Sequence, residues 1–143
     1  MSPIPARCVV DASVAVKWLV DEDEPDLEPA RSLLDARHRH ATDVLMLDLT
    51  FYEVGNALRR RLASEPEGIV PLILALFDLD VGVIPLDDSL AALAAVVAAE
   101  HDLTYHDAAY LAAARAADAV LITADRRLAG AAGDWGMTPA GLA

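Results

Sequence analysis

Cysteine and lysine are almost absent from this chain, which contains one of each among 143 residues. The single cysteine, Cys8, excludes an internal disulfide framework and a zinc site built from cysteine ligands. No apolar run reaches the roughly 18 residues that a membrane span requires. The first seven residues lack the basic segment and the apolar core of a signal peptide. These absences predict a cytoplasmic protein with no membrane partner.

Basic residues are scarce: 11 Lys and Arg stand against 23 Asp and Glu, giving a formal net charge of −12. Such a charge argues against the long-range attraction typical of a nucleic-acid binder, and favours a basic protein partner or bound cations. The charge is uneven, because residues 21–28 hold six of the 23 acids while basic residues gather at 37–40, 59–61 and 126–127. Net charge therefore leaves the partner open.

Short apolar runs alternate with longer segments of helical periodicity. Strands are predicted at 8–10, 44–47, 81–86 and 119–123, and the tail 135–143 can add a brief edge strand. Helices are predicted after Ser13, after Pro25, from Asp48 or Thr50 to about Ala63, over about 68–78 with Pro71 in the first turn, from 87–89 to about Glu100, over Asp107–Ala117, and from Asp125 to a stop at Gly130 and Gly133. This alternation predicts one α/β domain with a mostly parallel sheet of four or five strands, flanked by helices in three layers.

Asp11 follows directly on the β-branched run Cys8-Val9-Val10, which is typical of a buried parallel strand. Ser13 can cap the helix that follows. Open α/β sheets bind ligands at the carboxyl ends of their strands. A charge beside a buried strand needs a metal, a hydrogen-bond donor or a cation as partner. Asp11 is therefore the first candidate site residue.

Three further acids are predicted at the same sheet edge: Glu53 in the first turns of its helix, Asp107 at a helix start, and Asp125 two residues beyond the last predicted long strand. Four carboxylates share a pocket only if cations offset their repulsion. Oxygen ligands suit Mg²⁺ or Mn²⁺, and two such ions can clamp the attacking and leaving oxygens of a phosphodiester. The pattern indicates a metal-dependent phosphodiesterase site.

Each acid also has a purely structural explanation. Asp107 is a good helix cap, Asp125 is an ordinary turn-and-cap residue, and Glu53 can lie on a solvated helix face. Asp11 is the hardest to explain in this way, because a buried strand rarely ends in an unpaired charge. Spacing alone leaves both explanations open.

Four segments resemble the PIN-domain ribonucleases, specifically the VapC-type toxins of toxin–antitoxin pairs. They are residues 9–19, 52–58, 104–111 and 121–128, and they occur in the order found in that family. The resemblance implies a single PIN-like domain over residues 1–143. It also implies an Mg²⁺- or Mn²⁺-dependent endoribonuclease that dimerises and is held inactive by a small DNA-binding antitoxin.

By position, the family's acidic quartet falls on Asp11, Glu53, Asp107 and Asp125, and its small polar helper falls on Ser13 or Thr123. We expect the three aspartates to hold metal directly, and Glu53 to hold a second ion or orient water.

Several other polar residues are candidates for supporting roles at this site. Asn56 can hydrogen-bond to a ligand water or to Glu53, and Lys17, Arg59 and Arg126 can contact RNA. The alternative for each of these cations is a solvated position on a helix surface.

The apolar residues of the second to fourth predicted helices exceed what one sheet face needs, so some are expected to form a groove for an antitoxin helix. These residues are Leu33, Leu34, Phe51, Leu58, Leu62, Leu76 and Phe77.

Other functions remain to be weighed against a toxin ribonuclease. A phosphoacceptor domain needs adjacent acids after its first strand, and a haloacid-dehalogenase-like phosphatase needs Asp-x-Asp; here Ala12 and Ser13 occupy those places. A PIN nuclease of RNA processing and a metal-binding interaction module without catalysis are the remaining alternatives. The sequence does not identify the RNA target.

Overall fold

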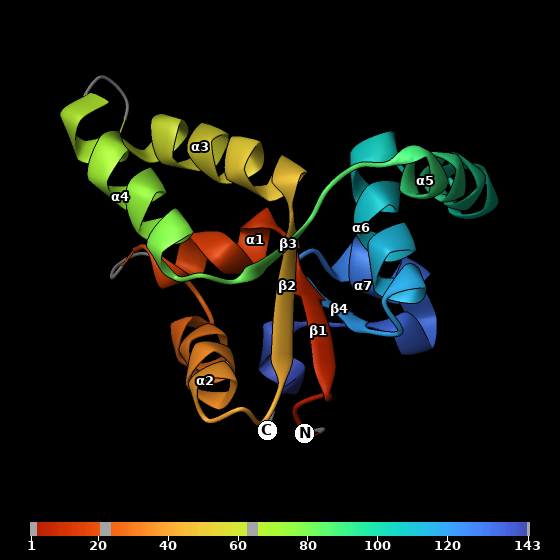
Figure 1. Cartoon of the computed structure of the whole chain (residues 1–143), viewed down its shortest axis with the longest axis horizontal. Coiled ribbons are helices and arrows are strands. Elements are labelled where there is room, and N and C mark those ends of the chain that lie inside the picture. The colour runs from red at the N-terminus through yellow and green to blue at the C-terminus, as the bar shows by residue number, and fades with distance from the viewer. Residues whose placement is uncertain (1–2, 21–23, 63–65, 143) are drawn as a thin grey trace.

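The computed structural model describes residues 3–20, 24–62 and 66–142, and it contains a five-stranded sheet in which every pairing is parallel (Figure 1). In chain order the strands are β1 (Arg7–Val10), β2 (Asp43–Leu47), β3 (Gly82–Ile84), β4 (Val120–Ile122) and β5 (Gly136–Met137). Their order across the sheet is β3-β2-β1-β4-β5. The predicted α/β class is confirmed, and the tail supplies the fifth strand at one edge.

Seven α-helices and three short 3-10 turns connect the strands in the described part of the chain. The helices are α1 (Ala12–Ala15), α2 (Leu27–His38), α3 (Asp48–Leu62), α4 (Pro66–Asp78), α5 (Asp88–His101), α6 (Tyr105–Ala116) and α7 (Arg126–Ala132). The 3-10 turns are η1 (Val16–Trp18), η2 (Gly133–Trp135) and η3 (Pro139–Gly141). None of the helices found in residues 3–20, 24–62 and 66–142 has the length and apolar character needed to span a bilayer.

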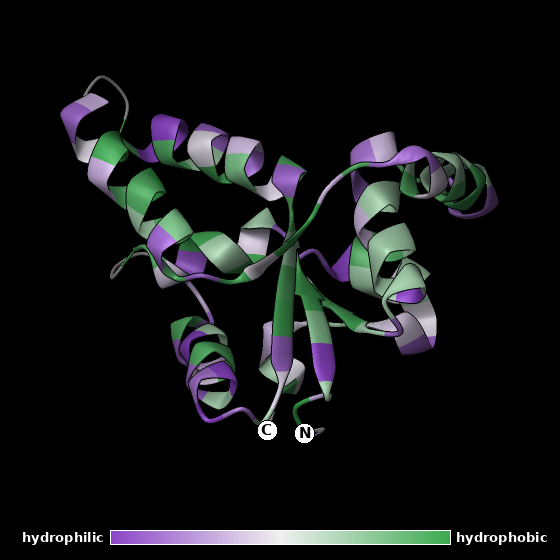
Figure 2. Cartoon of the chain, in the orientation of Figure 1, coloured by the Kyte–Doolittle hydropathy of each residue, from purple (hydrophilic) through white to green (hydrophobic). Residues whose placement is uncertain are grey.

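The sheet divides the hydrophobic core into two layers. Alternate side chains of a strand point to opposite faces, so Val9 packs with α5, α6 and α7, while Cys8 and Val10 pack with α1 to α4. Figure 1 shows these helix groups on either side of the strands, and Figure 2 shows apolar residues along the strands beyond the hydrophilic first residues of β1 and β2. The predicted three-layer arrangement is confirmed.

Helix α6 is the most deeply buried helix in the described chain, with every residue from 108 to 114 buried. Five of these seven residues are alanines. Such small side chains let the backbone of α6 approach both α5 and the sheet closely, and explain why this segment is rich in alanine. The buried run of α6 begins directly after its first turn, which carries Asp107.

Two predicted helix starts were wrong. Helix α6 begins at Tyr105 rather than Asp107, because the hydroxyl of Thr104 accepts a hydrogen bond from the Asp107 N–H and caps the helix. Helix α4 begins at Pro66, so Pro71 lies inside the helix rather than in its first turn.

Two other predicted caps have different outcomes. Helix α3 begins at Asp48, one of the two residues predicted to cap it, and Asp48 Oδ1 accepts from the Leu49 N–H while the Thr50 hydroxyl accepts from the Leu47 N–H. Ser13 does not cap α1, because its hydroxyl is directed to Asp11. Ala63, the predicted end of α3, lies outside the described residues.

Strand β1 is the point at which the direction of the chain across the sheet reverses. The connections from β1 lead first to β2 and β3 on one side, and later to β4 and β5 on the other. In open α/β sheets the crevice at such a switch point, beyond the carboxyl ends of the strands, is the usual place for a ligand. Asp11 is the residue that follows β1 there.

Candidate functional site

Asp11 is a buried carboxylate with two hydroxyl donors. Its side chain is only 7% exposed. The Ser13 hydroxyl donates to Oδ1 at 2.5 Å, and the Thr123 hydroxyl donates to Oδ2 at 2.5 Å. The resemblance placed the family's small polar helper at Ser13 or Thr123, and in the structure both of these residues bond to Asp11. The two hydroxyls therefore fix the orientation of the carboxylate.

The same hydroxyls connect Asp11 to the loop that follows β4. Ser13 Oγ accepts a hydrogen bond from the Ala124 N–H at 2.9 Å, and Thr123 Oγ1 accepts one from the Asp125 N–H at 3.1 Å. Asp125 in turn caps α7, because its Oδ1 accepts from the N–H groups of the second and third helical residues at 2.9 and 3.1 Å. Residues separated by more than 110 positions in sequence thus form one unit at the end of β1.

Burial raises the pKa of Asp11 from its ordinary value of 3.8 to about 6, although the hydrogen bonds from Ser13 and Thr123 act in the opposite direction. The negative charge of Glu53 raises this pKa further. Asp11 and Glu53 therefore interact electrostatically across the carboxyl edge of the sheet. A cation between them would relieve both the burial of charge and the repulsion.

Glu53 projects from the second turn of α3 and is held by a tyrosine that the sequence analysis did not single out. The Tyr110 hydroxyl donates to Glu53 Oε1 at 2.6 Å and lies 3.1 Å from the Thr50 hydroxyl. Thr50 also accepts from the Leu47 N–H at 3.1 Å. Burial, followed by the bond to Glu53, raises the pKa of Tyr110 far above its usual range, so this phenol stays a donor. The sequence feature that could have indicated this role is the hydroxyl of Tyr110 on the otherwise apolar buried face of α6.

Asp107 lies in the first turn of α6, next to His106, whose Nδ1 is 4.0 Å from Glu53 Oε2. The Asp107 side chain is half-buried, and the helix macrodipole favours a carboxylate in this turn. Asp107 thus lies at the beginning of the helix that also supplies the donor to Glu53. The grouping of the four acids around one metal stays a prediction.

In their present orientations, no three His, Cys, Asp or Glu side chains in residues 3–20, 24–62 and 66–142 form a cluster that could hold a metal ion. The chemistry of the available groups nevertheless fits Mg²⁺ or Mn²⁺. The donors are carboxylate oxygens, and two of them, on Asp11 and Glu53, already repel one another at a buried position. Asp125 is exposed and Asp107 is half-buried, so rotation of their side chains is compatible with completing such a site.

The predicted RNA-contacting residues differ in accessibility. Lys17 is 1% exposed, and its ammonium donates to Glu24 Oε1 at 2.6 Å and to the Pro25 carbonyl at 2.7 Å. Arg61 bonds to the other oxygen of Glu24. Lys17 is therefore a buried partner of Glu24, and the prediction that it contacts RNA is wrong.

Three other predicted residues lie at the surface. Asn56 is exposed one turn beyond Glu53, Arg59 is exposed in the last turn of α3, and Arg126 is exposed at the first position of α7. All three are accessible to a solvent-borne ligand, and the structure shows no separate role for Asn56.

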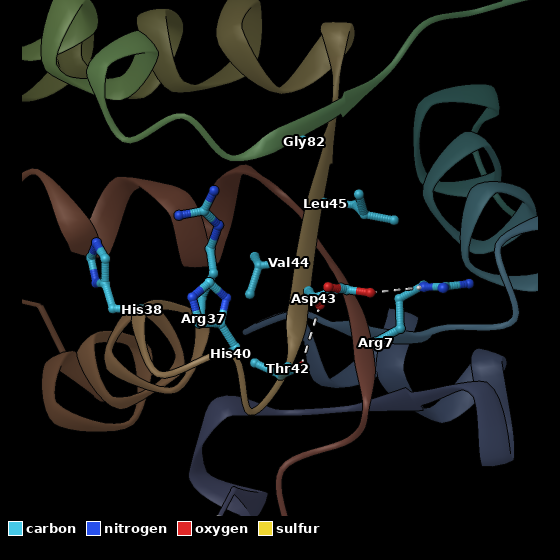
Figure 3. A pocket seen from close by; sticks show the side chains of 9 residues that line it. All are labelled: Arg7, Arg37, His38, His40, Thr42, Asp43, Val44, Leu45 and Gly82. Carbon is cyan, nitrogen blue, oxygen red and sulfur yellow. Dashed lines mark hydrogen bonds and ion pairs between the residues drawn. The ribbon is translucent and has the colours of Figure 1, made fainter.

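A cavity of about 720 Å³ lies at the opposite edge of the sheet from the four acids (Figure 3). Its lining includes Arg7 and Asp43, the first residues of β1 and β2, together with Arg37, His38 and His40 from the end of α2. Arg7 lies 3.6 Å from the Asp43 carboxylate and also donates to the Ala117 carbonyl. Arg37 donates to the Asp80 carbonyl. The two guanidinium groups are engaged in holding the fold, and this cavity is not part of the acidic site.

The Tyr110→Phe substitution tests the link between α6 and Glu53. Removing the hydroxyl takes away a hydrogen bond to a carboxylate, so we expect the free energy of unfolding to fall by about 2 kcal/mol. Tyr105→Phe is the matched control on the same helix, because it removes a bond to a backbone carbonyl and is expected to cost about 1 kcal/mol or less. Urea titration measures both. Equal losses in the two variants would contradict a special role for Tyr110.

The PIN domain family matches residues 8–134. Among solved structures, VapC20 of Mycobacterium tuberculosis, a sarcin-ricin loop cleaving toxin, superposes with a TM-score of 0.67 at 19% identity over 88% of this chain and 95% of its own. A toxin–antitoxin complex from Klebsiella pneumoniae gives a TM-score of 0.64 at 19% identity over 92% and 97% of the two chains.

PAE2754 from Pyrobaculum aerophilum has a TM-score of 0.63 at 24% identity, and the match covers 94% of this chain and 90% of that one. A search of curated protein sequences finds no significant match. At these identities the solved structures establish a shared fold, while the family match covers most of the chain. The predicted resemblance is confirmed: this chain belongs to the PIN domain family.

Proposed function

We propose that this chain is a Mg²⁺- or Mn²⁺-dependent endoribonuclease that acts as the toxin of a type II toxin–antitoxin pair. The observation that carries the proposal is the buried Asp11 carboxylate at the switch point of the sheet, oriented by two hydroxyls and repelled by Glu53. Membership of the PIN domain family supports it. So do proteins of the same fold described as a sarcin-ricin loop cleaving toxin and as part of a toxin–antitoxin complex.

Asp11, Asp107 and Asp125 would hold a divalent cation, with Glu53 binding a second one or orienting water. When bound, such a cation lowers the pKa of a water molecule and stabilises the charge on the leaving oxygen of a phosphodiester. The water oxygen forms a bond to phosphorus as the bond to the 3′ oxygen breaks, and the departing oxygen gains a proton. The products would carry 5′-phosphate and 3′-hydroxyl ends.

The chain's own residues would prepare this reaction by positioning the carboxylates. Ser13 and Thr123 hold both oxygens of Asp11, so the carboxylate does not need to reorganise when substrate arrives. Tyr110 engages one oxygen of Glu53, which leaves Oε2 directed toward the side of His106. Arg126, which is exposed and directly follows Asp125, and Arg59, which is exposed in the last turn of α3, would offset the net charge of −12 locally and attract the RNA backbone.

Metal-dependent cleavage is tested with the substitution Asp11→Asn. We expect the wild-type protein to cut unstructured RNA in 5 mM Mg²⁺, and EDTA to abolish the cutting. The Asp11→Asn variant should show only the activity that remains in EDTA. Asp118→Asn makes the same chemical change in a surface residue far from the acidic edge, and should leave the rate unchanged. The measurement is gel electrophoresis of end-labelled RNA.

Full activity in Asp11→Asn would refute the catalytic assignment. A wild-type protein that binds Mg²⁺ without cutting RNA would instead favour a metal-binding interaction module. Cleavage without any effect on bacterial growth upon expression would favour a PIN nuclease of RNA processing over a toxin.

Protein partners would use the apolar surface formed by α3, α4 and β3. Several large apolar side chains are exposed there: Tyr52, Val70, Leu74, Phe77 and Val83. Phe77 is 59% exposed and stacks on Phe51 at 4.2 Å between ring centroids, so part of the predicted groove exists. Leu33, Leu58 and Leu76 belong instead to the core. We assign this surface to an apolar helix of the antitoxin, and propose that the chain also forms homodimers through another surface.

The Phe77→Asp substitution tests this assignment, because a buried charge would disrupt an apolar interface. We expect the variant to remain dimeric in analytical ultracentrifugation but to lose its complex with the small basic protein co-expressed from the adjacent gene. Dissociation of the dimer with retention of that complex would show that the surface joins two copies of this chain.

A further inference from the structure

We propose that a small apolar cavity beside Glu53 binds one unstacked nucleobase of a single-stranded RNA, next to the phosphate that is cut. The inference rests on the proposed ribonuclease function and adds a subsite for the base beside the cleaved phosphate. The cavity has a volume of about 190 Å³. It is lined by Leu47, Asp48, Leu49, Leu86, Leu90, Tyr105, His106 and Ala109.

One residue of the cavity wall, His106, lies next to Glu53 of the acidic site. Leu47 ends β2, so the cavity opens at the carboxyl edge of the sheet, where the acids lie. His106 lines the cavity, and its Nδ1 lies 4.0 Å from Glu53 Oε2. Asp107 is the next residue of α6. A group seated in the cavity would therefore adjoin a phosphate held at the carboxylates.

Hydrogen bonds hold the walls of the cavity in place without a ligand. Asp48 Oδ1 accepts from the Leu49 N–H at 2.9 Å, and Asp48 Oδ2 accepts from the Leu86 N–H at 3.2 Å. These bonds fasten the β3–α5 connection to the start of α3. The Tyr105 hydroxyl donates to the Ala91 carbonyl at 2.8 Å, which fixes its ring against α5. A site that is already ordered loses little entropy on binding.

The exposed groups suit a base better than a larger ligand. Leu86 is 54% exposed and Tyr105 is 43% exposed, so an apolar side chain and an aromatic ring are both accessible. RNA-binding proteins stack unpaired bases on such rings. The volume lies below the 300–1,000 Å³ typical of pockets for drug-sized ligands, which favours a single ring system.

Asp48 gives the cavity one hydrogen-bond acceptor at its rim. Each of its oxygens has a further lone pair, which can accept from the exocyclic amino group of adenine, cytosine or guanine. Uracil has no such group, so we expect it to bind less well. Since a base must leave its stack to enter, the favoured substrate is a loop or another single-stranded segment rather than a duplex.

The test pairs a change in the cavity with a change in the RNA. The cleavage site of the wild-type protein is first mapped on an unstructured RNA, and fluorescent oligoribonucleotides are then made with one abasic nucleotide at each position beside it. Binding is measured by fluorescence anisotropy at constant salt, with Asp11→Asn present in every protein so that the RNA stays intact.

At one position we expect loss of the base to weaken binding about tenfold. Tyr105→Ala should weaken binding of the complete RNA by a similar factor, and should cause no further loss with the abasic RNA. Leu86→Ala provides a second variant for the same comparison. Tyr105→Phe retains the ring but loses the bond to Ala91, and should bind more tightly than Tyr105→Ala. Val96→Ala removes an apolar side chain of similar exposure (52%) outside the cavity and should have no effect.

The inference would be overturned if the abasic nucleotide and the two cavity variants weakened RNA binding independently, so that their effects added. Equal binding of the complete and abasic RNAs at every position would also overturn it. Both results leave the ribonuclease proposal intact if the wild-type protein cuts RNA. A wild-type protein that neither cuts nor binds RNA would overturn both proposals.

Discussion

The carboxylate of Asp11 and the two hydroxyls that hold it form the interaction on which the functional edge of this molecule depends. Asp11 follows the central strand of the sheet, and Ser13 and Thr123 approach it from the two sides of the switch point. The same hydroxyls accept bonds from the loop before α7, which carries Asp125. One set of short polar contacts therefore joins the beginning of the domain to its last αβ unit and places two acids at one edge.

A second polar connection joins the helical layers across the same edge. Tyr110 extends from α6 in one core layer to Glu53 on α3 in the other, and Thr50 connects this pair to the end of β2. Helix α6 is buried from residue 108 to residue 114, so the part that carries Tyr110 is anchored in the core. Two helices thus hold the Tyr110–Glu53 pair, whereas Asp125 lies in the loop before α7 and is held there by the bond from its N–H to Thr123.

The strands and the locations of the acids could be predicted from sequence because their signals are local. A β-branched run followed by an aspartate predicts a strand and places the aspartate at the carboxyl end of that strand. Contacts between distant residues have no such signal. Ser13 looks like a helix cap until Ala124 is found beside it, and Lys17 looks solvated until Glu24 is placed against its ammonium. Tyr110 resembles a core aromatic unless its partner is known.

The central claim is that the buried charge of Asp11 destabilises the fold until a cation binds to it. The dependence of the free energy of unfolding on pH and on Mg²⁺ tests this claim directly. The folded-state pKa of about 6 exceeds the ordinary 3.8, so without metal the protein should lose stability as the pH rises from about 4 to about 6. The Asp11→Asn variant should not show this fall in stability, because an amide side chain does not ionise. The free energy of unfolding of each protein is measured by urea titration in EDTA. The difference between the variant and the wild type should be about 3 kcal/mol larger at pH 7.5 than at a pH below both pKa values, in favour of the variant.

Addition of Mg²⁺ should reduce the advantage of Asp11→Asn at pH 7.5, because only the wild type can bind the cation through a charged Asp11. A difference between the two proteins that is independent of both pH and Mg²⁺ would contradict the account.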